Sequence, residues 1–315
     1  MNIAFMSSDP IALPSIEFVR ARHRLACVVS NPDRPKGRGK KLSPNDVSQW
    51  AIDSGVELLR PEGKPSGDVV RRFGELGVEL VLVMAYGCIL KENILRCGKY
   101  PCLNLHASLL PELRGASPIE TAIALGKTRT GVSLMAVSPA MDAGDVAGAA
   151  EVEISRDDTS KTLRKKIADA AVDVLQKYLP LLERGELRFA PQDSSRATYA
   201  RKLSKGDMFL DFRAGAETLR NRVRAFGAGI FEYENETVKI LDAEVCRAEK
   251  KFETCGEILK ADSGGLEIAC ARGAVRAKTL QRACCRAMCA RDFFAGFKMR
   301  EGFVLKSADN APLLR

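Results

Sequence analysis

Short apolar segments alternate with helical patterns through the first half of the chain, and this alternation constrains the fold more than any other feature. The apolar segments have strand length, and the stretches between them repeat hydrophobic residues with the helical period. A strand–helix–strand order places neighbouring strands parallel, with helices on both faces of the sheet. The expected strands cover residues 2–6, 25–30, 79–86, 102–107 and 131–137, and the expected helices cover residues 11–23, 45–54, 68–76 and 118–125. A mostly parallel sheet is therefore predicted.

The second half has a different character. A long amphipathic helix is expected over residues 158–183, and the polar, proline-containing stretch after it is typical of a linker. After a further helix at residues 215–226, short alternating segments separated by glycines are typical of a small β-barrel. We therefore predict an α/β protein with a Rossmann-like domain over residues 1–189, a linker over 190–206 and an OB-like β-barrel over 207–315.

Composition limits the class of protein. No apolar run approaches the ~20 residues that cross a bilayer, and the N-terminus lacks the pattern of a secretory signal. We therefore expect a cytoplasmic protein without membrane contact. A net charge of +9 favours an anionic partner. The ten cysteines are scattered except for Cys284, Cys285 and Cys289, and there are two histidines, so we expect reduced, mostly buried thiols and no metal site.

Asn104 and His106 lie two positions apart in the expected strand at residues 102–107. Side chains two apart in a strand point to the same face, whereas Leu103 and Leu105 point to the opposite, packed face. Both polar residues lie near the carboxyl end of the strand, where open parallel sheets bind ligands. An amide beside an imidazole suits a carbonyl oxygen that gains charge during nucleophilic attack. An isolated histidine is more often an ordinary core or surface residue.

A second polar element, MDAGD, follows the expected strand at residues 131–137. It carries Asp142 and Asp145 in a glycine-containing loop, which we expect at the same carboxyl edge of the sheet. A carboxylate there can hydrogen-bond His106, fix its tautomer and favour its charged form. Asp beside Gly is also common in turns, so a purely structural Asp142 is the alternative.

The strings NLHASLLPELRGASPI and MDAGD resemble the signature of formyltransferases that use 10-formyltetrahydrofolate. NPDRPKGRGKKL, VMAYGCIL and YARKLSKGD extend the resemblance to the methionyl-tRNA formyltransferase family over nearly the whole chain. The resemblance implies Asn104, His106 and Asp142 as catalytic residues and 10-formyltetrahydrofolate as formyl donor, with no metal. It implies that the folate is bound by the turn residues Ser108, Leu109, Leu110 and Pro111 and, along the pterin, by Ala85, Tyr86, Gly87, Ile89 and Leu90.

The implied reaction transfers the formyl group to the α-amine of methionyl initiator tRNA. We expect the protein to be a monomer. Asn104 and protonated His106 stabilise the oxyanion, and Asp142 orients His106 and handles the leaving proton. The basic segment RPKGRGKKL follows the second strand and matches the family loop that enters the acceptor stem. The residues expected to bind tRNA are Arg34, Lys36, Arg38, Lys40 and Lys41.

Arg220, Arg222 and Arg224 of the expected helix at residues 215–226 support the same tRNA partner more weakly, and a solubilising face is the alternative. Two segments depart from the family pattern. Ser7-Ser8-Asp9-Pro10 replaces a Gly-Thr-Pro turn after the first strand, and RAFGAGIFEY replaces a stretch that usually carries Asn-Pro-Trp-Pro. These departures put in question the methionyl pocket and the entry to the barrel.

Four other functions fit part of the pattern. A glycinamide ribonucleotide formyltransferase uses the same three residue types but typically lacks a C-terminal barrel and the basic loop. A 10-formyltetrahydrofolate hydrolase module or a sugar-nucleotide formyltransferase does not need so basic a loop. A non-catalytic RNA-binding module is disfavoured because all three catalytic positions are intact.

Overall fold

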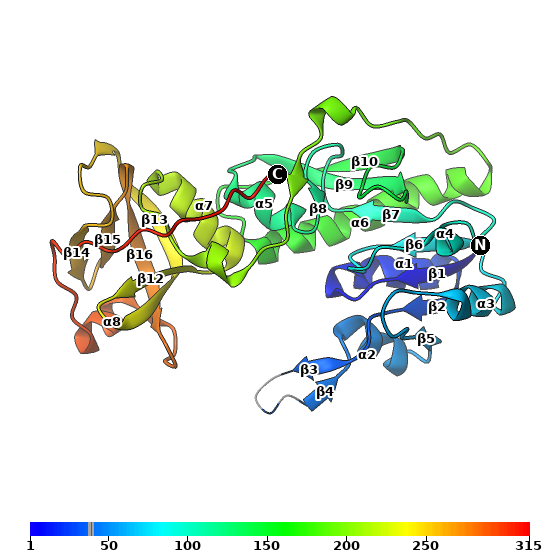
Figure 1. Ribbon diagram of the computed structural model, residues 1–315, viewed down its shortest axis with the longest axis horizontal. Helices are drawn as coiled ribbons and strands as arrows, with labels where there is room; N and C mark the ends of the chain where they lie inside the picture. The colour runs from blue at the N-terminus through cyan, green and yellow to red at the C-terminus, as the bar shows by residue number, and fades with distance from the viewer. Residues whose placement is uncertain (37–38, 40) are drawn as a thin grey trace. The chain divides into compact units, whose positions relative to one another are not determined.

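The computed structural model describes residues 1–36, 39 and 41–315, and these form two compact units. The N-terminal unit comprises residues 1–118, 129–153 and 164–199, and the C-terminal unit comprises residues 119–128, 154–163 and 200–315 (Figure 1). The first is an α/β unit and the second is mainly antiparallel β, so the predicted fold class is confirmed. The boundaries predicted at residues 189 and 207 remain a proposal. Arg38 and Lys40 lie outside the described residues.

The N-terminal unit is organised around one mixed sheet. In the described part of the chain its spatial order is β10 (Val146–Glu153), β9 (Arg129–Ala136), β7 (Leu103–His106), β6 (Leu80–Val83), β1 (Asn2–Met6), β2 (Arg24–Val29) and β5 (Leu58–Leu59). The five strands from β7 to β5 are parallel, whereas β9 runs antiparallel to β7 and β10 runs antiparallel to β9. The carboxyl ends of the parallel strands therefore share one edge of the sheet.

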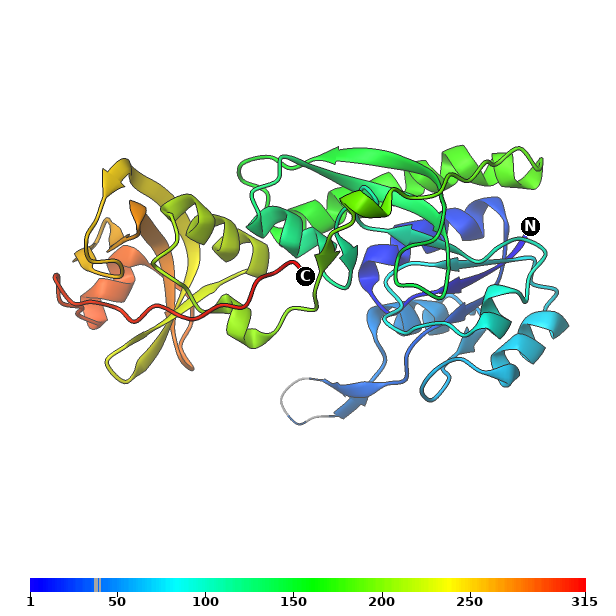
Figure 2. The ribbon, with the colours of Figure 1, turned by 45° about the horizontal axis from the view of Figure 1, so that its top comes forward.

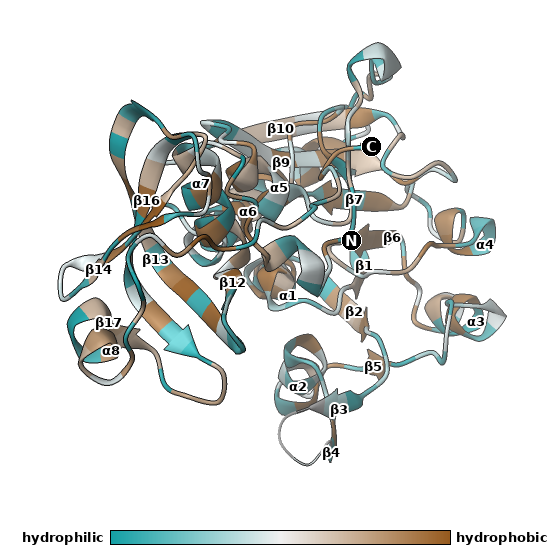
Figure 3. Ribbon diagram, turned by 60° about the vertical axis from the view of Figure 1, so that its left-hand side comes forward, coloured by the Kyte–Doolittle hydropathy of each residue, from teal (hydrophilic) through white to brown (hydrophobic). Residues whose placement is uncertain are grey.

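Helices cover both faces of this sheet, as apolar strands require. The helices and 3-10 turns of the unit are η1 (Pro10–Ala12), α1 (Leu13–Arg22), α2 (Asp46–Asp53), α3 (Gly67–Glu75), α4 (Glu92–Leu95), α6 (Ser160–Glu183) and η2 (Ser194–Arg196). One apolar cluster joins Phe73 of α3 and Ile94 of α4 to inward residues of β1, β2 and β6. Helices α1 and α6 lie on the other face (Figure 2). β6 is hydrophobic along its length (Figure 3).

Gly148 lets α6 approach the edge strand β10. A Cβ atom at this position would lie 2.0 Å from Cζ of Tyr178, which is far closer than two carbons can pack. The Tyr178 ring therefore occupies the space that a side chain on Gly148 would need. Small residues on β10 explain why its sequence, VAGAAEVE, lacks the alternation that marks the other strands.

The C-terminal unit contains an antiparallel sheet and, in the described residues, four helical segments. Its elements are α5 (Pro118–Ala124), β11 (Tyr199–Ala200), η3 (Lys205–Met208), α7 (Ala216–Phe226), β12 (Gly229–Tyr233), β13 (Glu236–Lys251), β14 (Ile258–Asp262), β15 (Gly265–Ala269), β16 (Arg272–Arg282), β17 (Met288–Cys289) and α8 (Ala290–Gly296). The first residues of α5 and β11 belong to the N-terminal unit. The strands pair in the order β12–β13–β16–β15–β14, and β17 pairs with β16. The core between this sheet and α7 and α8 is apolar and includes Leu219, Phe231 and Phe293.

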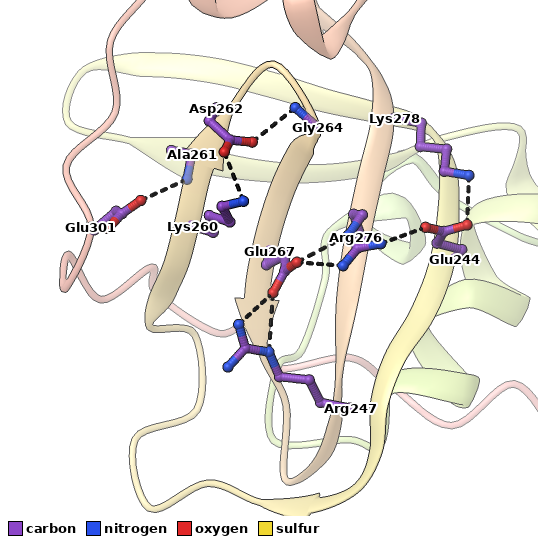
Figure 4. A network of polar contacts seen from close by, with 10 residues as sticks. All are labelled: Glu244, Arg247, Lys260, Ala261, Asp262, Gly264, Glu267, Arg276, Lys278 and Glu301. Atoms are coloured by element: carbon purple, nitrogen blue, oxygen red, sulfur yellow. Dashed lines mark hydrogen bonds and ion pairs between the residues drawn. The ribbon is translucent and has the colours of Figure 1, made fainter.

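A buried carboxylate organises the polar face of this sheet. Glu267 on β15 is 3% exposed and accepts hydrogen bonds from Arg247 and Arg276 (Figure 4). Arg276 also donates to Glu244, which pairs in turn with Lys278. The two arginines lower the pKa of Glu267, although burial opposes them as the largest single influence. The cations on this face are therefore occupied by carboxylates of the same unit.

The ten cysteines are free thiols, and their exposure corrects one expectation. Cys27, Cys102 and Cys270 are buried, whereas Cys284, Cys285 and Cys289 are exposed. The other four are half-buried, so the prediction of mostly buried thiols is wrong. Cys284 and Cys285 are exposed because they lie in the turn between β16 and β17, and Cys289 ends the short strand β17. No helix in the described residues is long and apolar enough to span a membrane.

An ion pair fixes the chain where it enters the C-terminal unit. Arg201 and Asp207 are both nearly buried, and Arg201 Nη1 donates to Asp207 Oδ2 at 2.9 Å. Asp207 Oδ2 also accepts from the backbone N–H of Ser204. Arg201 further donates to the carbonyl of Pro312, so the same side chain holds the C-terminal segment. This part of the predicted linker is thus an ordered, hydrogen-bonded turn.

Replacing Asp207 with Asn should destabilise the protein in a pH-dependent way. The hydrogen bond from Arg201 lowers the pKa of Asp207 from 3.8 to about 2, so its stabilising effect is complete above about pH 4 and is lost as the pH falls toward 2. We expect Asp207→Asn to lower the free energy of unfolding by ~2 kcal/mol at pH 7 and by less at pH 3, measured by urea denaturation.

Asp309→Asn is the matched control. Asp309 pairs with Arg213 but its side chain is 92% exposed, so the same substitution should cost much less. Equal losses of unfolding free energy for the two variants would contradict a stabilising ion pair between Arg201 and Asp207. A loss for Asp207→Asn that does not change between pH 7 and pH 3 would contradict it as well.

Candidate functional site

The structure places Asn104 and His106 as predicted, on one face of β7 and at its carboxyl end. Leu103 and Leu105, on the opposite face, are 0% and 2% exposed. β7 runs parallel to β6, so its carboxyl end lies at the edge shared by the parallel strands. Asn104 is half-buried and His106 is only 6% exposed. The two side chains therefore leave the sheet on the same face, with little exposure of the imidazole.

His106 has both ring nitrogens close to protein oxygens. Nε2 lies 3.0 Å from the carbonyl oxygen of Leu113, and because a carbonyl can only accept, Nε2 must carry the hydrogen. Nδ1 lies 3.7 Å from Oδ2 of Asp142. This separation is longer than a hydrogen bond. Nδ1 is therefore the nitrogen that remains available for a reacting group.

The loop that carries Asp142 reaches His106 by a route that differs from the prediction. We expected this loop at the carboxyl edge of the sheet. β9 is antiparallel to β7, with Ala136 beside Leu103 and Ser133 beside His106, so the loop leaves the sheet next to the start of β7. It then folds back to bring Asp142 to His106. The contact between the two residues was predicted, but the position of the loop exit was wrong.

Two residues hold this folded loop in place. Gly144 passes close to β9, where a Cβ atom would lie 1.9 Å from the carbonyl oxygen of Ala136, so only glycine fits. Gln192 Nε2 donates to the carbonyl oxygens of Asp142 and Gly144 at 2.8 Å and 2.7 Å. Its Oε1 accepts from Arg114, which is 2% exposed. Gln192 thereby links the loop to the segment that follows β7.

Asp142 itself makes a strong structural contact. Its Oδ2 accepts from the backbone N–H of Gly115, in β8 (Arg114–Gly115), at 2.7 Å. Asp142 adopts a left-handed backbone conformation with φ of 50°, which is uncommon for a residue other than glycine. The contacts with Gly115 and Gln192 stabilise that conformation. Asp142 is thus more than an ordinary turn residue.

Ser133 on β9 organises the turn after β7. Its hydroxyl donates to the carbonyl of Ser108 at 2.7 Å and accepts from the N–H of Leu110 at 3.1 Å. The Leu109 side chain lies over Gly131, where a Cβ atom would be 2.5 Å from it. Ser108 donates to the carbonyl of Glu112 at 2.6 Å. The predicted folate turn, which also includes Pro111, is therefore ordered by neighbouring residues on β9.

The segment 85–90 presents alternating residues to the outside. Ala85, Gly87 and Ile89 are exposed, and Ile89 is 60% exposed. Tyr86 and Leu90 are buried in the apolar cluster between the sheet and α3 and α4. The side chains of Tyr86 and Leu90 therefore face the core, and a ligand on the outside would meet the backbone of Tyr86.

The basic segment forms a short two-stranded ribbon, β3 (Arg34–Lys36) and β4 (Lys41–Ser43), where the prediction was a flexible loop. It follows β2 at the carboxyl edge, as expected. Arg34 and Lys41 are exposed, and Leu42 is 65% exposed. An ion pair between Asp33 and Arg60, at 2.7 Å, fixes the base of the ribbon.

The three arginines of α7 are held within the C-terminal unit. Arg220 pairs with Asp157 at 2.8 Å, Arg222 donates to the carbonyl of Asp207, and Arg224 donates to the carbonyl of Asp158. Burial lowers the pKa of Arg222 and of Arg224. These guanidinium groups are therefore structural, and the sequence-based suggestion that they form a free basic face is not supported.

The Ser7-Ser8-Asp9 turn has its own internal support. Asp9 caps η1 by accepting from the N–H of Ile11 at 3.0 Å, and it also pairs with Arg164 of α6. The backbone N–H of Asp9 donates to the Ser7 hydroxyl. The departure from the expected Gly-Thr-Pro turn is thus accommodated by a capped turn tied to α6.

No group of three or more histidine, cysteine or acidic side chains in the described residues is arranged to hold a metal ion.

A model of the family described as formyl transferase matches residues 5–179, and one described as formyl transferase, C-terminal domain, matches residues 202–298. A methionyl-tRNA formyltransferase of Acetivibrio thermocellus is 37% identical over 97% of this chain and 99% of its own length. One of Sulfurihydrogenibium sp. is 34% identical over 96% and 99%.

The chain belongs to the methionyl-tRNA formyltransferase family. Solved structures with the same fold are more distant in sequence. An N-formyltransferase from Helicobacter canadensis, in complex with folinic acid and dTDP-3-aminofucose, has a TM-score of 0.66 at 14% identity and covers 88% of this chain and 98% of its own. HypX from Aquifex aeolicus, in complex with tetrahydrofolic acid, has a TM-score of 0.60 at 17% identity and covers 93% and 47%. This member of the methionyl-tRNA formyltransferase family therefore shares its fold with that N-formyltransferase and with HypX.

Replacing Tyr86 with Phe should leave both stability and folate binding intact. Among the described residues the Tyr86 hydroxyl is buried without a hydrogen-bond partner, and its burial raises the pKa of that hydroxyl. Removing an unsatisfied buried group should leave the free energy of unfolding unchanged or raise it by up to ~1 kcal/mol. Urea denaturation and tetrahydrofolate titration check the two expectations.

Tyr233→Phe is the matched control for this substitution. Tyr233 is also buried, but its hydroxyl accepts from the N–H of Arg300 at 3.0 Å, so the same change should cost ~1 kcal/mol. Weaker tetrahydrofolate binding by Tyr86→Phe would show that the hydroxyl contacts the ligand after all.

Proposed function

We propose that this enzyme transfers the formyl group of 10-formyltetrahydrofolate to the α-amino group of methionyl initiator tRNA. The observation that carries the proposal is the approach of Asp142 Oδ2 to His106 Nδ1, next to Asn104 and with His106 Nε2 held by Leu113. Full-length relatives named methionyl-tRNA formyltransferase support the choice of acceptor. The match to both formyl transferase family models supports a formyl donor.

His106 acts through Nδ1 in this mechanism. Nε2 already donates to the Leu113 carbonyl, so an Nδ1–H on the protonated ring is the donor that can face the developing oxyanion. The amide of Asn104, on the same face of β7, supplies the second donor. Asp142 Oδ2 lies 3.7 Å from Nδ1 and places a negative charge beside the ring.

The reaction needs no covalent enzyme intermediate. The amine attacks the formyl carbon, a tetrahedral oxyanion forms, and the bond from that carbon to N10 of the folate breaks. The proton that leaves the amine passes to Asp142, directly or through water, and a proton is returned to N10. His106 and Asn104 stabilise the charge on the oxygen during these steps.

The folate lies, in this proposal, against the turn at Ser108–Pro111 and the outer side of the segment 85–90. Exposed backbone at Ala85 and Gly87 and the exposed Ile89 side chain suit a flat ring with hydrogen-bonding edges. Arg34, Lys36, Arg38, Lys40 and Lys41 contact the acceptor stem, and phosphate contacts by such a ribbon would position the tRNA end. Arg34 and Lys41 are exposed, as this role requires.

A sugar-nucleotide formyltransferase is the second candidate, because such an enzyme shares the fold. At 14% identity that likeness extends to the fold alone. The assay that separates the two supplies 10-formyltetrahydrofolate with either methionyl initiator tRNA or an amino-sugar nucleotide. We expect formyl-methionine from the first reaction and no formylated sugar from the second.

Asp142→Asn should lower kcat for formyl transfer by ~10²-fold without unfolding the protein. The amide oxygen can still accept from the Gly115 N–H, so the loop keeps its shape, but the negative charge beside His106 Nδ1 is lost. Single-turnover formylation of methionyl-tRNA measures the rate, and thermal unfolding reports on the fold.

Asp145→Asn makes the same substitution three positions further along the loop. Asp145 is exposed and makes its contact with Ala136 through the backbone carbonyl, which the substitution keeps. Its kcat should stay within about twofold of the unmodified enzyme. Near-full turnover by a folded Asp142→Asn variant would remove Asp142 from the catalytic set.

A further inference from the structure

Asn31 lies at the carboxyl ends of β1, β2 and β6, directly after β2 and before the basic ribbon. It begins the segment NPDRPKGRGKKL but belongs to none of the catalytic, folate-binding or tRNA-binding sets named above. We propose that Asn31 is a positioning residue for the formyl donor, which holds the backbone of residues 85–88 in the shape that receives the folate ring. The inference rests on the proposed function and names a further residue that the same site needs.

Both ends of the Asn31 side chain bind the same short segment. Nδ2 donates to the carbonyl oxygen of Tyr86 at 2.8 Å. Oδ1 accepts from the Sγ of Cys88 at 3.6 Å, a contact typical of a weak thiol donor. The Asn31 amide therefore spans residues 86 to 88 and clamps the turn between them.

That turn needs an external support. Ala85 and Gly87 both adopt left-handed backbone conformations, with φ of 49° and 79°. The first is unfavourable for a residue with a side chain. The Tyr86 carbonyl lies between these two residues, and the Tyr86 ring makes no hydrogen bond among the described residues. The contact with Asn31 is thus the polar interaction that fixes the direction of this carbonyl.

Asn31 is itself fixed from behind. Its backbone N–H donates to the hydroxyl of Ser8 at 2.9 Å, and its carbonyl accepts from Nδ2 of Asn45 at 3.3 Å. Asn45 Nδ2 also donates to the hydroxyl of Ser30 at 2.9 Å. The Ser8 N–H donates to the carbonyl of Ala85 at 3.3 Å, which closes the network on the turn. Ser8 of the unusual N-terminal turn therefore supports the same backbone.

A rigid turn here matters for binding because the exposed groups are backbone. A flat ring that bonds to peptide N–H and C=O groups depends on their direction, and a turn that must be ordered on binding costs affinity. None of the hydrogen bonds named in this network involves His106 or Asp142. Loss of the Asn31 contact should therefore weaken donor binding and leave the chemical step largely unchanged.

Asn31→Asp is the most direct test, because it keeps the shape of the side chain and replaces the Nδ2 donor with an oxygen that faces the Tyr86 carbonyl. Titration with tetrahydrofolate alone should show a dissociation constant raised about tenfold. The KM for the formyl donor should rise similarly, whereas kcat at saturating donor and the KM for methionyl-tRNA should stay within about threefold.

Asn31→Ser removes the donor without adding charge, and it serves if Asn31→Asp does not fold. It should weaken tetrahydrofolate binding in the same direction. Asn93→Asp is the control for the added charge: Asn93 is exposed, and its Oδ1 accepts from the N–H of Ile94, a contact that Asp can keep. Its tetrahydrofolate affinity should match that of the unmodified protein.

The outcomes separate this inference from the proposed function. Folded Asn31 variants that bind tetrahydrofolate as tightly as the unmodified protein overturn the role of Asn31, whatever the acceptor is. A fall in kcat with an unchanged donor KM overturns it as well. An unmodified protein that binds tetrahydrofolate but does not formylate methionyl-tRNA contradicts the proposed function and leaves the role of Asn31 in place.

Discussion

The site depends on one carboxylate. Asp142 Oδ2 accepts from the N–H of Gly115 and lies 3.7 Å from Nδ1 of His106, so a single side chain joins the loop after β9, the segment after β7 and the end of β7 itself. The antiparallel direction of β9 makes this possible, because the loop must fold back to reach the carboxyl end of β7. Gly144 and Gln192 hold it in that path. Loss of this contact would separate the proton-handling group from the imidazole.

The fold was largely predictable because the hydrophobic residues of most strands and helices repeat with the period of that secondary structure. The strand at residues 2–6 was predicted with its observed bounds, and the helix expected over 158–183 begins only two residues later. β10 was missed because an edge strand with small residues at half of its positions has no apolar alternation. β3 and β4 were missed because a charged ribbon outside the core has no buried face to mark it.

The catalytic residues of the site were predictable from the sequence, but the residues that hold them and their loops in place were not. Asn104, His106 and Asp142 stand in motifs, whereas Gly131, Ser133 and Gln192 act through contacts with residues far along the chain and leave no local pattern. For the arginines of α7, the sequence shows a local pattern but not its role. Sequence reveals a run of charges, but only the fold shows that Arg220 and Arg224 are occupied by partners within their own unit.

The protonation of His106 tests the central claim most directly. The chain has two histidines, so the ¹⁵N resonances of His106 can be assigned by comparison with a His23→Gln variant. With Leu113 as acceptor, a long-range ¹H–¹⁵N spectrum of the free protein with a neutral His106 ring should show Nε2 protonated and Nδ1 bare. A neutral ring that carries its hydrogen on Nδ1 would contradict the assignment of Nδ1 to Asp142 and the reacting group.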